Sequence, residues 1–418
     1  MNRTFTYFIV GAMILGIAVG WACNAFLEPA SAKSVASGLS LITDVFLRLI
    51  KMIIAPLVFT TLVAGIAHME DAAAVGRIGA KTMAWFIGAS IVSLTIGLIM
   101  VHLLQPGSGL SLPIPPTDAK APGVDVTNFT LKDFLTHLVP ASIVDAMAKN
   151  EILQIVVFSI FVGTAVATID EKAPAVLALV EQAAAIMLKV TGFVMRLAPL
   201  AIFAALSATI AKEGLAVLVT YAKFIGGFYL SLAILWTLLL GAGFLVVGRR
   251  IPALVNAARD PAVLAFSTAS SEAAYPRLLE RLVAFGIPRR IVSFVLPLGY
   301  SFNLDGSMMY CTFATLFIAQ VYGIDLSIPQ QVTMLLLLMI TSKGMAGVPR
   351  ASLVVIAATL TFFKLPEAGL LLILGVDHVL DMGRSATNVI GNSVAAAVVG
   401  KWERQLTDGT EAVEPVKA

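Results

Sequence analysis

The sequence predicts an all-α polytopic membrane protein, for three reasons. Hydrophobic residues make up 59% of the 418 residues, against about 45–50% in soluble domains. Charged residues amount to 13%, roughly half of the usual share of about 25%. Apolar runs of about 20 residues, enough to cross a bilayer as helices, recur along the chain. Because a soluble protein of this length needs far more ionic surface, most of the chain must have lipid as its solvent.

Six apolar segments that are long enough to span a bilayer occupy the chain up to residue 247. They run from 7 to 27, about 39 to 67, 78 to 104, 131 to 169 with a break, 175 to 211 and 215 to 247. Beyond residue 251 the apolar stretches are shorter, and small or polar clusters interrupt them at 267–274, 303–307, 342–349 and 377–392. The last part of the chain is therefore organised differently from the first.

The distribution of positive charge orients these segments, since Lys and Arg concentrate in cytoplasmic loops. Arg residues occur after the second segment, on both sides of 251–285 and after the last segment, at 77, 249–250, 289–290 and 404. The connection 105–128 contains no Arg and is placed outside. Both termini are then cytoplasmic. The number of membrane crossings agrees with this placement of the loops only if 251–285 and 327–364 each enter and leave the membrane on the same side. The prediction is eight transmembrane helices plus two re-entrant helical hairpins.

Each predicted hairpin has a tip made of small residues, at 269–271 in the first and 344–349 in the second. Non-helical backbone at membrane depth is tolerated only where protein or a water-filled cavity covers it. Broken segments of this kind mark binding sites in transporters, because half-helix N-termini offer hydrogen-bond donors to anions. The alternative is a small-residue packing seam between helices.

A stripe of five polar residues marks the last segment: Asp377, Asp381, Arg384, Asn388 and Asn392. Their spacing of four, three, four and four residues places them on one face of a helix. Ionisable residues at this depth cost at least ~2.5 kcal/mol each, so the stripe must face a cavity, a partner or a ligand. An Arg fork can grip a carboxylate bidentately while an Asp one turn earlier holds an ammonium. The stripe predicts a receptor for an acidic zwitterion, and an Asp–Arg pair that joins helices is the alternative.

The pentapeptide Asn303–Ser307 interrupts another apolar span. A Gly flanked by Asn and Asp breaks a helix and frees backbone carbonyls, which hard cations prefer as ligands. In mid-membrane, opposite a charged helix, this break predicts a cation or proton site. A plain turn is the alternative.

Other classes of protein fit the sequence poorly. A net charge of +3 without a basic, aromatic stripe excludes nucleic-acid binding. Cys23 and Cys311 both lie in apolar runs, so we expect neither a disulfide framework nor a metal site or cofactor. Four scattered histidines and the lack of a protease motif argue against an enzyme. A channel needs a continuous polar path, whereas these polar residues gather in one place.

Several motifs together resemble one family. They are residues 46–52 (Phe-Leu-Arg-Leu-Ile-Lys-Met), the tip at 270–271, 303–307, 344–349 and 381–388. With them the chain resembles the dicarboxylate/amino-acid:cation symporter family, which contains the glutamate transporters, and it is most similar to bacterial proton-coupled glutamate/aspartate symporters. The motifs follow the family order across nearly the whole chain.

The resemblance implies an inverted-repeat elevator fold and a homotrimer in the inner membrane. A fixed scaffold would comprise residues 1–77 (helices 1 and 2) and 106–212 (helices 4 and 5, with the extracellular loop that precedes them). Residues 78–105 (helix 3) and 213–404 (helix 6, hairpin 1, helix 7, hairpin 2, helix 8) would form a moving transport domain. Residues 405–418 would be a disordered cytoplasmic tail.

The resemblance also assigns roles to residues of the stripe. Arg384 would bind the side-chain carboxylate of the substrate and Asp381 its amino group, while Asn388 and Ser385 would hold the main-chain carboxylate and amino end. Ser307, where the family usually has Thr, would touch the side-chain carboxylate. The pocket would be closed by backbone at Ser270, Ser271, Ala346 and Gly347.

Departures from the family pattern concern the coupling ion. Sodium-coupled members have an Asp at the position of Asn392, and their Tyr and Thr ligands correspond to Phe86 and Ala89, so that only Ser90 keeps an oxygen. Met345 stands where their second hairpin has Thr. Neither Phe nor Ala can ligate a hard cation, so two of the three expected sodium sites are impaired.

Three carboxylates remain as candidate proton carriers: Asp305, Asp377 and Glu272. Burial can raise the pKa of a carboxyl group toward the physiological range, although Glu272 can equally be a solvated residue at a helix N-terminus. Asn303, Asn392 and Ser90 complete the candidate coupling site. We therefore expect proton-coupled uptake, with sodium coupling as the alternative.

The choice of substrate depends on Asp381. The bacterial branch for succinate, malate and fumarate shares the Ser-Ser-Glu hairpin and the 342–344 turn, but commonly lacks this acidic residue, because dicarboxylates have no ammonium to pair. Arg384 argues against neutral amino acids. We expect glutamate or aspartate as the substrate, and C4-dicarboxylates as the alternative.

Overall fold

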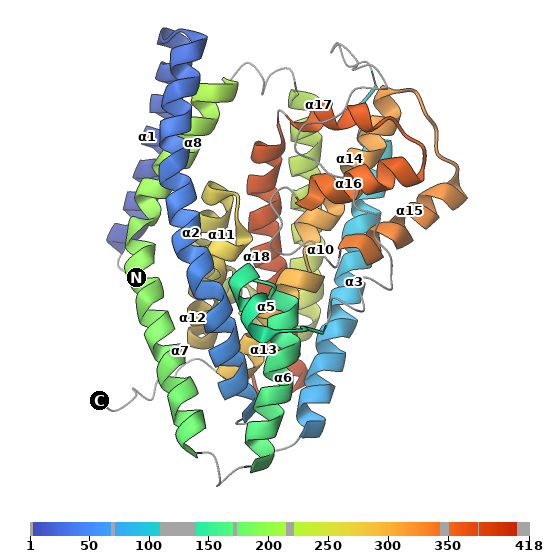
Figure 1. Cartoon of the computed structure of the whole chain (residues 1–418). Coiled ribbons are helices and arrows are strands. Elements are labelled where there is room, and N and C mark those ends of the chain that lie inside the picture. The colour runs from blue at the N-terminus through green and yellow to red at the C-terminus, as the bar shows by residue number, and fades with distance from the viewer. Residues whose placement is uncertain are drawn as a thin grey trace.

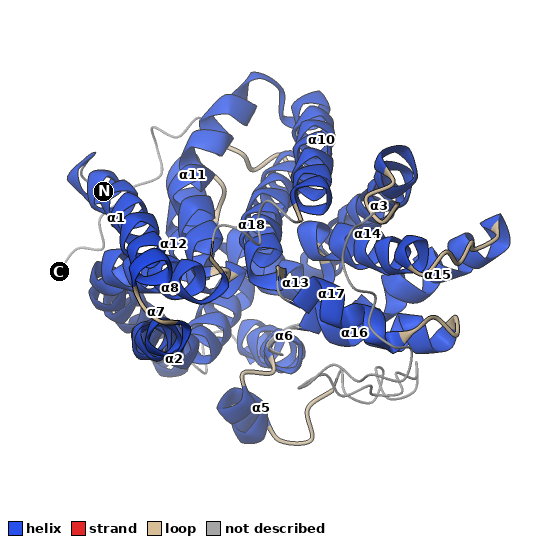
Figure 2. Cartoon of the chain, turned by 90° about the horizontal axis from the view of Figure 1, so that it is seen from above, coloured by secondary structure: helices blue, strands red, loops and turns tan. Residues whose placement is uncertain are grey.

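The computed structural model describes residues 3–67, 72–108, 139–169, 174–214, 221–342, 351–374 and 376–407. These residues form helices and no strands. Two groups of helices lie side by side, with α18 (Asp377–Trp402) in the middle (Figures 1 and 2). The all-helical prediction is thus confirmed for the described part of the chain.

The first group of helices comes from the first half of the chain. It consists of α1 (Arg3–Phe26), α2 (Pro29–Ala67), α5 (Ile143–Lys149), α6 (Ile152–Ile169), α7 (Pro174–Val194) and α8 (Ala198–Glu213). The long helix α2 connects the group, because α6, α7 and α8 all pack on it, and α1 packs on α8. The side of this group that faces outward carries large exposed apolar residues such as Leu41, Phe161 and Leu179.

The second group contains α3 and most of the second half of the chain. It consists of α3 (Ala72–Leu104), α10 (Ala222–Val247), α11 (Ile251–Thr268), α12 (Ser271–Phe285), α13 (Arg289–Phe302), α14 (Asp305–Val321), α15 (Ile328–Thr341), α16 (Ala351–Phe362), α17 (Leu370–Leu374) and α18. The central helix α18 packs on α10, α11, α12, α13, α14 and α3. Its residues are buried over almost the whole length, from Met382 to Gly400.

Five helical stretches of the described chain are long and apolar enough to cross a membrane. They are Pro29–Ala67, Ala74–Leu104, Ile152–Ile169, Pro174–Lys212 and Ala222–Thr268. Shorter apolar helices occur at Gly11–Phe26, Ile328–Thr341 and Ser352–Phe362. The central helix α18 is not among the five, since its polar stripe lowers its hydropathy. These features are those of an integral membrane protein.

The fourth predicted segment differs from the expectation of a single broken span. Its first part, 131–138, lies outside the described residues, and the rest forms two helices. Ser142 caps the short helix α5 by accepting a hydrogen bond from the Asp145 amide (3.4 Å), and Asn150 ends it in a left-handed conformation (φ 55°). Because α5 has only seven residues, α6 alone supplies a span here.

Two helix breaks occur where the sequence predicted them. Ala269 and Ser270 separate α11 from α12, and these two helices pack against each other. Asn303 and Leu304 separate α13 from α14. Helices α15 and α16 flank the predicted tip of the second hairpin, and this tip, 344–349, lies outside the described residues.

Candidate functional site

The polar stripe of α18 lies inside the second group of helices. Asp377, Arg384, Asn388 and Asn392 are all buried, with at most 6% of their surface exposed. Buried charges need partners of opposite charge or hydrogen bonds. The stripe has such partners on α14 and on the break before it, and they divide into two clusters.

The Arg384 cluster consists of Arg384, Asp377, Asp381 and Tyr310. The Nη2 of Arg384 lies 3.1 Å from Asp377 Oδ1 and 3.0 Å from Asp381 Oδ1. The guanidinium carbon lies 4.1 Å from the ring centroid of Tyr310, a cation–π distance, and the Tyr310 hydroxyl donates to Asp377 Oδ1 (3.1 Å). Both ion pairs lie within α18, so they do not join two helices.

Two nitrogens of the Arg384 guanidinium have no protein partner in the part of the chain that the structure describes. Its Nε and Nη1 are buried and have no hydrogen-bond partner within the described residues. A buried donor without a partner costs about 1–3 kcal/mol, and more when it is charged. Nε–H points to the edge that Nε shares with Nη2, and Nη1 lies on the other edge, so each of the two can donate a hydrogen bond to an acceptor oxygen of its own. The cluster therefore keeps two charged donors for an anionic group such as a carboxylate.

Asp381 differs from Asp377 in its exposure. The side chain of Asp381 is 36% exposed, whereas that of Asp377 is 8% exposed. Asp377 Oδ1 accepts hydrogen bonds from both Tyr310 and Arg384. Asp377 is thus a fixed partner of the arginine, while Asp381 is accessible to a cationic group such as an ammonium.

Asn388 joins α18 to the first turn of α14. Its Oδ1 accepts a hydrogen bond from the Gly306 amide (2.9 Å), and its Nδ2 donates to Ser307 Oγ (3.2 Å). A Cβ atom at Gly306 would lie 2.6 Å from the carbonyl oxygen of Arg384, so only glycine permits this close approach. Ser307 and Asn388, predicted separately as substrate ligands, are thereby brought together one turn from Arg384. Ser385 is buried beside them.

The Asp305 cluster consists of Asp305, Asn303, Asn392 and Ser93. The Nδ2 of Asn303 donates to Asp305 Oδ2 and to Asn392 Oδ1, both at 3.0 Å. Ser93 Oγ donates to Asp305 Oδ1 at 3.2 Å. Asn303 Oδ1 and Asn392 Nδ2 are buried without a hydrogen-bond partner among the described residues. The break in the chain at 303–304 thus places polar groups from three helices around one buried carboxylate.

The first hairpin tip begins the helix α12. Ala269 has a left-handed backbone (φ 47°), and Ser270 caps α12 by accepting a hydrogen bond from the Ala273 amide (3.3 Å). Ser271 and Glu272 occupy the first turn. Both α11 and α12 pack on α18, but neither serine is hydrogen-bonded to the Arg384 cluster in the described ranges. The hydrogen bond that caps α12 gives Ser270 a structural role.

Ala346, Gly347 and Met345, predicted at the tip of the second hairpin, lie outside the described residues. Phe86 and Ala89 are buried in α3 at 1% and 6% exposure, and Ser90 is buried in the same helix. Within the residues that the structure describes, no group of three or more His, Cys, Asp or Glu side chains could hold a metal ion.

Sequence reasoning missed two residues of the site. Tyr310 stacks on Arg384 and hydrogen-bonds to Asp377, and Ser93 hydrogen-bonds to Asp305. Each lies three residues after a predicted one, since Tyr310 follows Ser307 and Ser93 follows Ser90. Helical spacing places each of them on the same face as a predicted residue, but it does not predict the contacts that they make with other helices.

A third ionic cluster lies at the end of α18. Glu403 accepts hydrogen bonds from Lys81 Nζ (2.7 Å) and Arg77 Nη2 (3.0 Å). Burial opposes ionisation of Glu403, but these hydrogen bonds and the two positive charges outweigh it, so the pKa of Glu403 lies below its usual value. Arg290 donates to Gln405 (3.2 Å), and the Thr407 amide to the Gly286 carbonyl (3.0 Å). Residues 405–407 of the predicted tail are thus hydrogen-bonded to the helices, and 408–418 lie outside the described residues.

The fold and the site together define an integral membrane protein with a buried, charged stripe beside a helix break. The sequence pattern of the sodium:dicarboxylate symporter family matches residues 5–402. The chain belongs to this family, as the motifs at 303–307 and 381–388 predicted.

Curated relatives match over nearly the full length. A proton/sodium-glutamate symport protein of Geobacillus stearothermophilus is 40% identical over 401 residues, 95% of this chain and 94% of the relative. The proton/glutamate-aspartate symporter of Escherichia coli (strain K12) is 40% identical over 417 residues, 95% of this chain and 92% of the relative. A C4-dicarboxylate transport protein of Laribacter hongkongensis is 40% identical over 379 residues, 89% and 85% of the two chains.

Proposed function

We propose that this protein is a secondary active symporter that imports glutamate or aspartate together with protons. The observation that carries the proposal is the buried guanidinium of Arg384, which is held by Asp377 and Asp381 while Nε and Nη1 have no partner in the described part of the chain. Each of these charged donors can hydrogen-bond to a carboxylate oxygen of the substrate, and the accessible Asp381 matches an ammonium.

The charge of the cluster favours an amino acid over a dicarboxylate. Asp377, Asp381 and Arg384 carry a formal charge of minus one when both carboxylates are ionised. A dicarboxylate would add two further negative charges at a buried site, where unbalanced charge is costly. An acidic amino acid adds only one, and its ammonium can pair with Asp381. Two of the three relatives above are named for glutamate.

A C4-dicarboxylate symporter is the second candidate function. The name of the Laribacter hongkongensis relative favours it, and the donors Nε and Nη1 of Arg384, which have no partner in the described ranges, fit the carboxylates of either substrate. Protonation of Asp381 would remove the excess charge. The two candidates thus differ in the role that they give to Asp381.

Proton coupling is supported by the Asp305 cluster. Asp305 is completely buried, and the hydrogen bonds from Ser93 and Asn303 come from neutral donors. Asn392 has an amide side chain, which lacks the negative charge with which a carboxylate would attract a cation. Full burial favours the neutral form of a carboxyl group in general, and this is the ground on which we propose Asp305 as the proton carrier. Because the hydroxyl and amide oxygens here could also ligate Na⁺, sodium coupling is the alternative, and we propose no other cofactor.

The packing of the helices supports a division into a scaffold and a transport domain. α2 organises α6, α7 and α8, whereas α18 organises α3, α10 and α11–α14. The contacts between the two groups include those of α2 with α12 and α13. We propose that the α18 group moves against the α2 group as an elevator in a homotrimer of the inner membrane, with both termini cytoplasmic. The hairpins α11–α12 and α15–α16 would then be re-entrant.

The purified protein in proteoliposomes tests the function directly. Uptake of labelled glutamate, aspartate and succinate is measured across an imposed proton gradient without sodium, and across a sodium gradient at equal pH. Concentrative, saturable uptake of glutamate or aspartate with the proton gradient alone supports the proposal. Uptake that strictly requires sodium contradicts proton coupling, and uptake of succinate alone contradicts the choice of substrate.

A further inference from the structure

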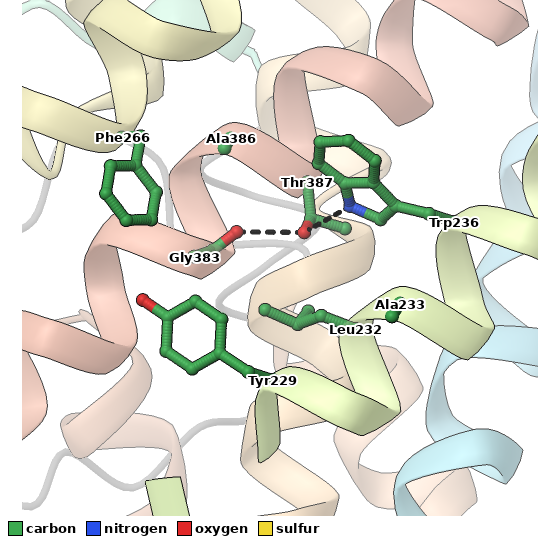
Figure 3. Close-up of a pocket in the computed structure, with 8 residues that line it drawn as sticks. All are labelled: Tyr229, Leu232, Ala233, Trp236, Phe266, Gly383, Ala386 and Thr387. Atoms are coloured by element: carbon green, nitrogen blue, oxygen red, sulfur yellow. Dashed lines mark hydrogen bonds between the residues drawn. The ribbon is translucent and has the colours of Figure 1, made fainter. Parts of the chain in front are cut away.

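A groove outside the polar stripe lies on the opposite side of α18. Its floor is formed by Gly383, Ala386 and Thr387, and its walls by α10 and by Phe266 of α11 (Figure 3). The α10 wall consists of Tyr229, Leu232, Ala233 and Trp236. The cavity volume is about 240 Å³. An apolar cavity of ~150 Å³ is enough to hold a benzene molecule, so this groove has room for a larger apolar group.

The polar atoms of the groove are already occupied. Trp236 Nε1 donates to Thr387 Oγ1 (2.8 Å), which in turn donates to the Gly383 carbonyl (2.8 Å) (Figure 3). The Tyr229 hydroxyl donates to the Val379 carbonyl (2.6 Å). The rings of Tyr229 and Phe266 lie edge to face with centroids 6.5 Å apart. The N–H and O–H donors of these side chains are therefore already used, and the predominantly apolar lining favours an apolar occupant.

The mouth of the groove opens where the surface is apolar. The floor residues are buried, Tyr229, Trp236 and Phe266 are half-buried, and Ala233 is exposed. The wall helix α10 belongs to the candidate membrane span Ala222–Thr268. It also exposes Leu230, Leu238 and Leu245 by 49%, 44% and 87%. A hydrophobic surface of this kind on a membrane span faces hydrocarbon. The groove therefore opens toward the lipid of the bilayer.

We propose that this groove binds an acyl chain of a bilayer lipid between α10 and α11. The acyl chain fills a cavity in which a water molecule would find few hydrogen-bond partners. A Cβ atom at Gly383 would lie 2.7 Å from Leu232 Cδ1, so α18 and α10 are in tight contact beside the cavity. The bound chain completes the packing behind Arg384, which immediately follows Gly383 in α18.

Photo-labelling of the full-length protein in lipid nanodiscs tests the proposal. The nanodiscs contain a phospholipid with a photoactivatable diazirine in its acyl chain, and mass spectrometry locates the label. We expect label on the residues of the groove in the wild type, and a several-fold loss in Ala233→Trp, whose indole occupies the cavity. The matched control Leu238→Trp introduces the same side chain on the exposed surface of α10 and leaves labelling of the groove unchanged.

Trp236 provides a second measurement if Ala233→Trp does not fold. The other tryptophans are replaced in Trp21→Phe, Trp85→Phe and Trp402→Phe, and quenching by phospholipids brominated along the acyl chain is recorded. Addition of the smaller substitution Ala233→Leu should reduce the quenching. The proposal would be overturned if the wild-type groove carried no label, or if labelling and quenching were unchanged by Ala233→Trp and Ala233→Leu. The groove would then be assigned to contacts with protein. Because neither readout involves transport, the result is independent of the proposed symport.

Discussion

The two polar clusters beside α18 use buried carboxylates in opposite ways. In the Arg384 cluster two carboxylates hold a guanidinium that keeps two donors without partners among the described residues, and Asp381 is partly exposed. In the Asp305 cluster the carboxylate is fully buried, and both of its oxygens accept hydrogen bonds from neutral side chains. The first arrangement is suited to a charged substrate and the second to a small ion. We therefore propose that substrate recognition and ion coupling occur at separate neighbouring sites, which Asn388 and the first turn of α14 join.

The largest effect is expected from Arg384. Hydrogen bonds to charged groups contribute about 1.5–3 kcal/mol each, so loss of two in Arg384→Ala should weaken substrate binding at least about a hundredfold. Arg384→Lys keeps the charge but lacks the fork, and should recover only part of the affinity. Isothermal titration calorimetry with glutamate measures both. Arg259→Ala, at an exposed arginine, is the control, and equal affinities for all variants would remove Arg384 from the site.

Asp381 should separate the two candidate substrates. In Asp381→Ala the affinity for glutamate should fall by about tenfold to a hundredfold, which corresponds to one charge-assisted hydrogen bond. Binding of succinate should stay unchanged or improve, because a negative charge is removed. Asp377→Asn, which alters the fixed partner of Arg384, should weaken both ligands. Competition against labelled glutamate gives the affinities, and an unchanged affinity of Asp381→Ala for glutamate contradicts the ammonium assignment.

A substitution in the Asp305 cluster should change the coupling ion. Asn392→Asp adds a second carboxylate close to Asn303, whose Nδ2 lies 3.0 Å from the present Asn392 oxygen. Because a hard cation prefers carboxylate oxygens, uptake should become several-fold stimulated by sodium. Proteoliposomes with and without a sodium gradient provide the measurement. Asn388→Asp, in the substrate region, should not produce this stimulation, and a sodium response equal to that of the wild type contradicts the assignment of the cluster.

The smallest effect is expected at Glu403, whose ion pairs lie outside both clusters. Its pKa is lowered in the folded protein, so its contribution to stability is present above the unfolded value of about 4.3 and is lost as the pH falls through the folded value. Glu403→Gln should therefore lower the thermal midpoint slightly at pH 7, and the difference from the wild type should shrink below about pH 4. Thermal unfolding in detergent at several pH values measures this. A difference that grows toward low pH would contradict the pairing with Arg77 and Lys81.

Much of the fold was predictable because lipid imposes strict rules on composition. Apolar length predicted the spans, and small or polar clusters predicted the breaks at 269–270 and 303–304. The spacing of the stripe correctly placed Arg384 and Asp381 on one face of α18. Helical periodicity within one segment suffices for such predictions. The short capped helix α5 was missed, since its end depends on local hydrogen bonds of Ser142 and Asn150.

The contacts between helices were less predictable. The stacking of Tyr310 on Arg384 and the hydrogen bond from Ser93 to Asp305 depend on how α14 and α3 are rotated about their axes. Packing of neighbouring helices sets that rotation, and no spacing within a single segment encodes it. The same reason explains why the groove beneath Trp236 was not foreseen, since three separate helices form it.

The binding of a carboxylate by Arg384 can be measured most directly by solid-state NMR. The protein, labelled with ¹⁵N-arginine and reconstituted in lipid, is studied with glutamate that carries ¹³C only at its side-chain carboxyl carbon. We expect dipolar dephasing between this carbon and a guanidinium nitrogen of Arg384 at about 4 Å, as in a charge-assisted hydrogen bond, and its loss in Arg384→Lys. Dephasing that persists in Arg384→Lys, or none in the wild type under saturating glutamate, would contradict the account.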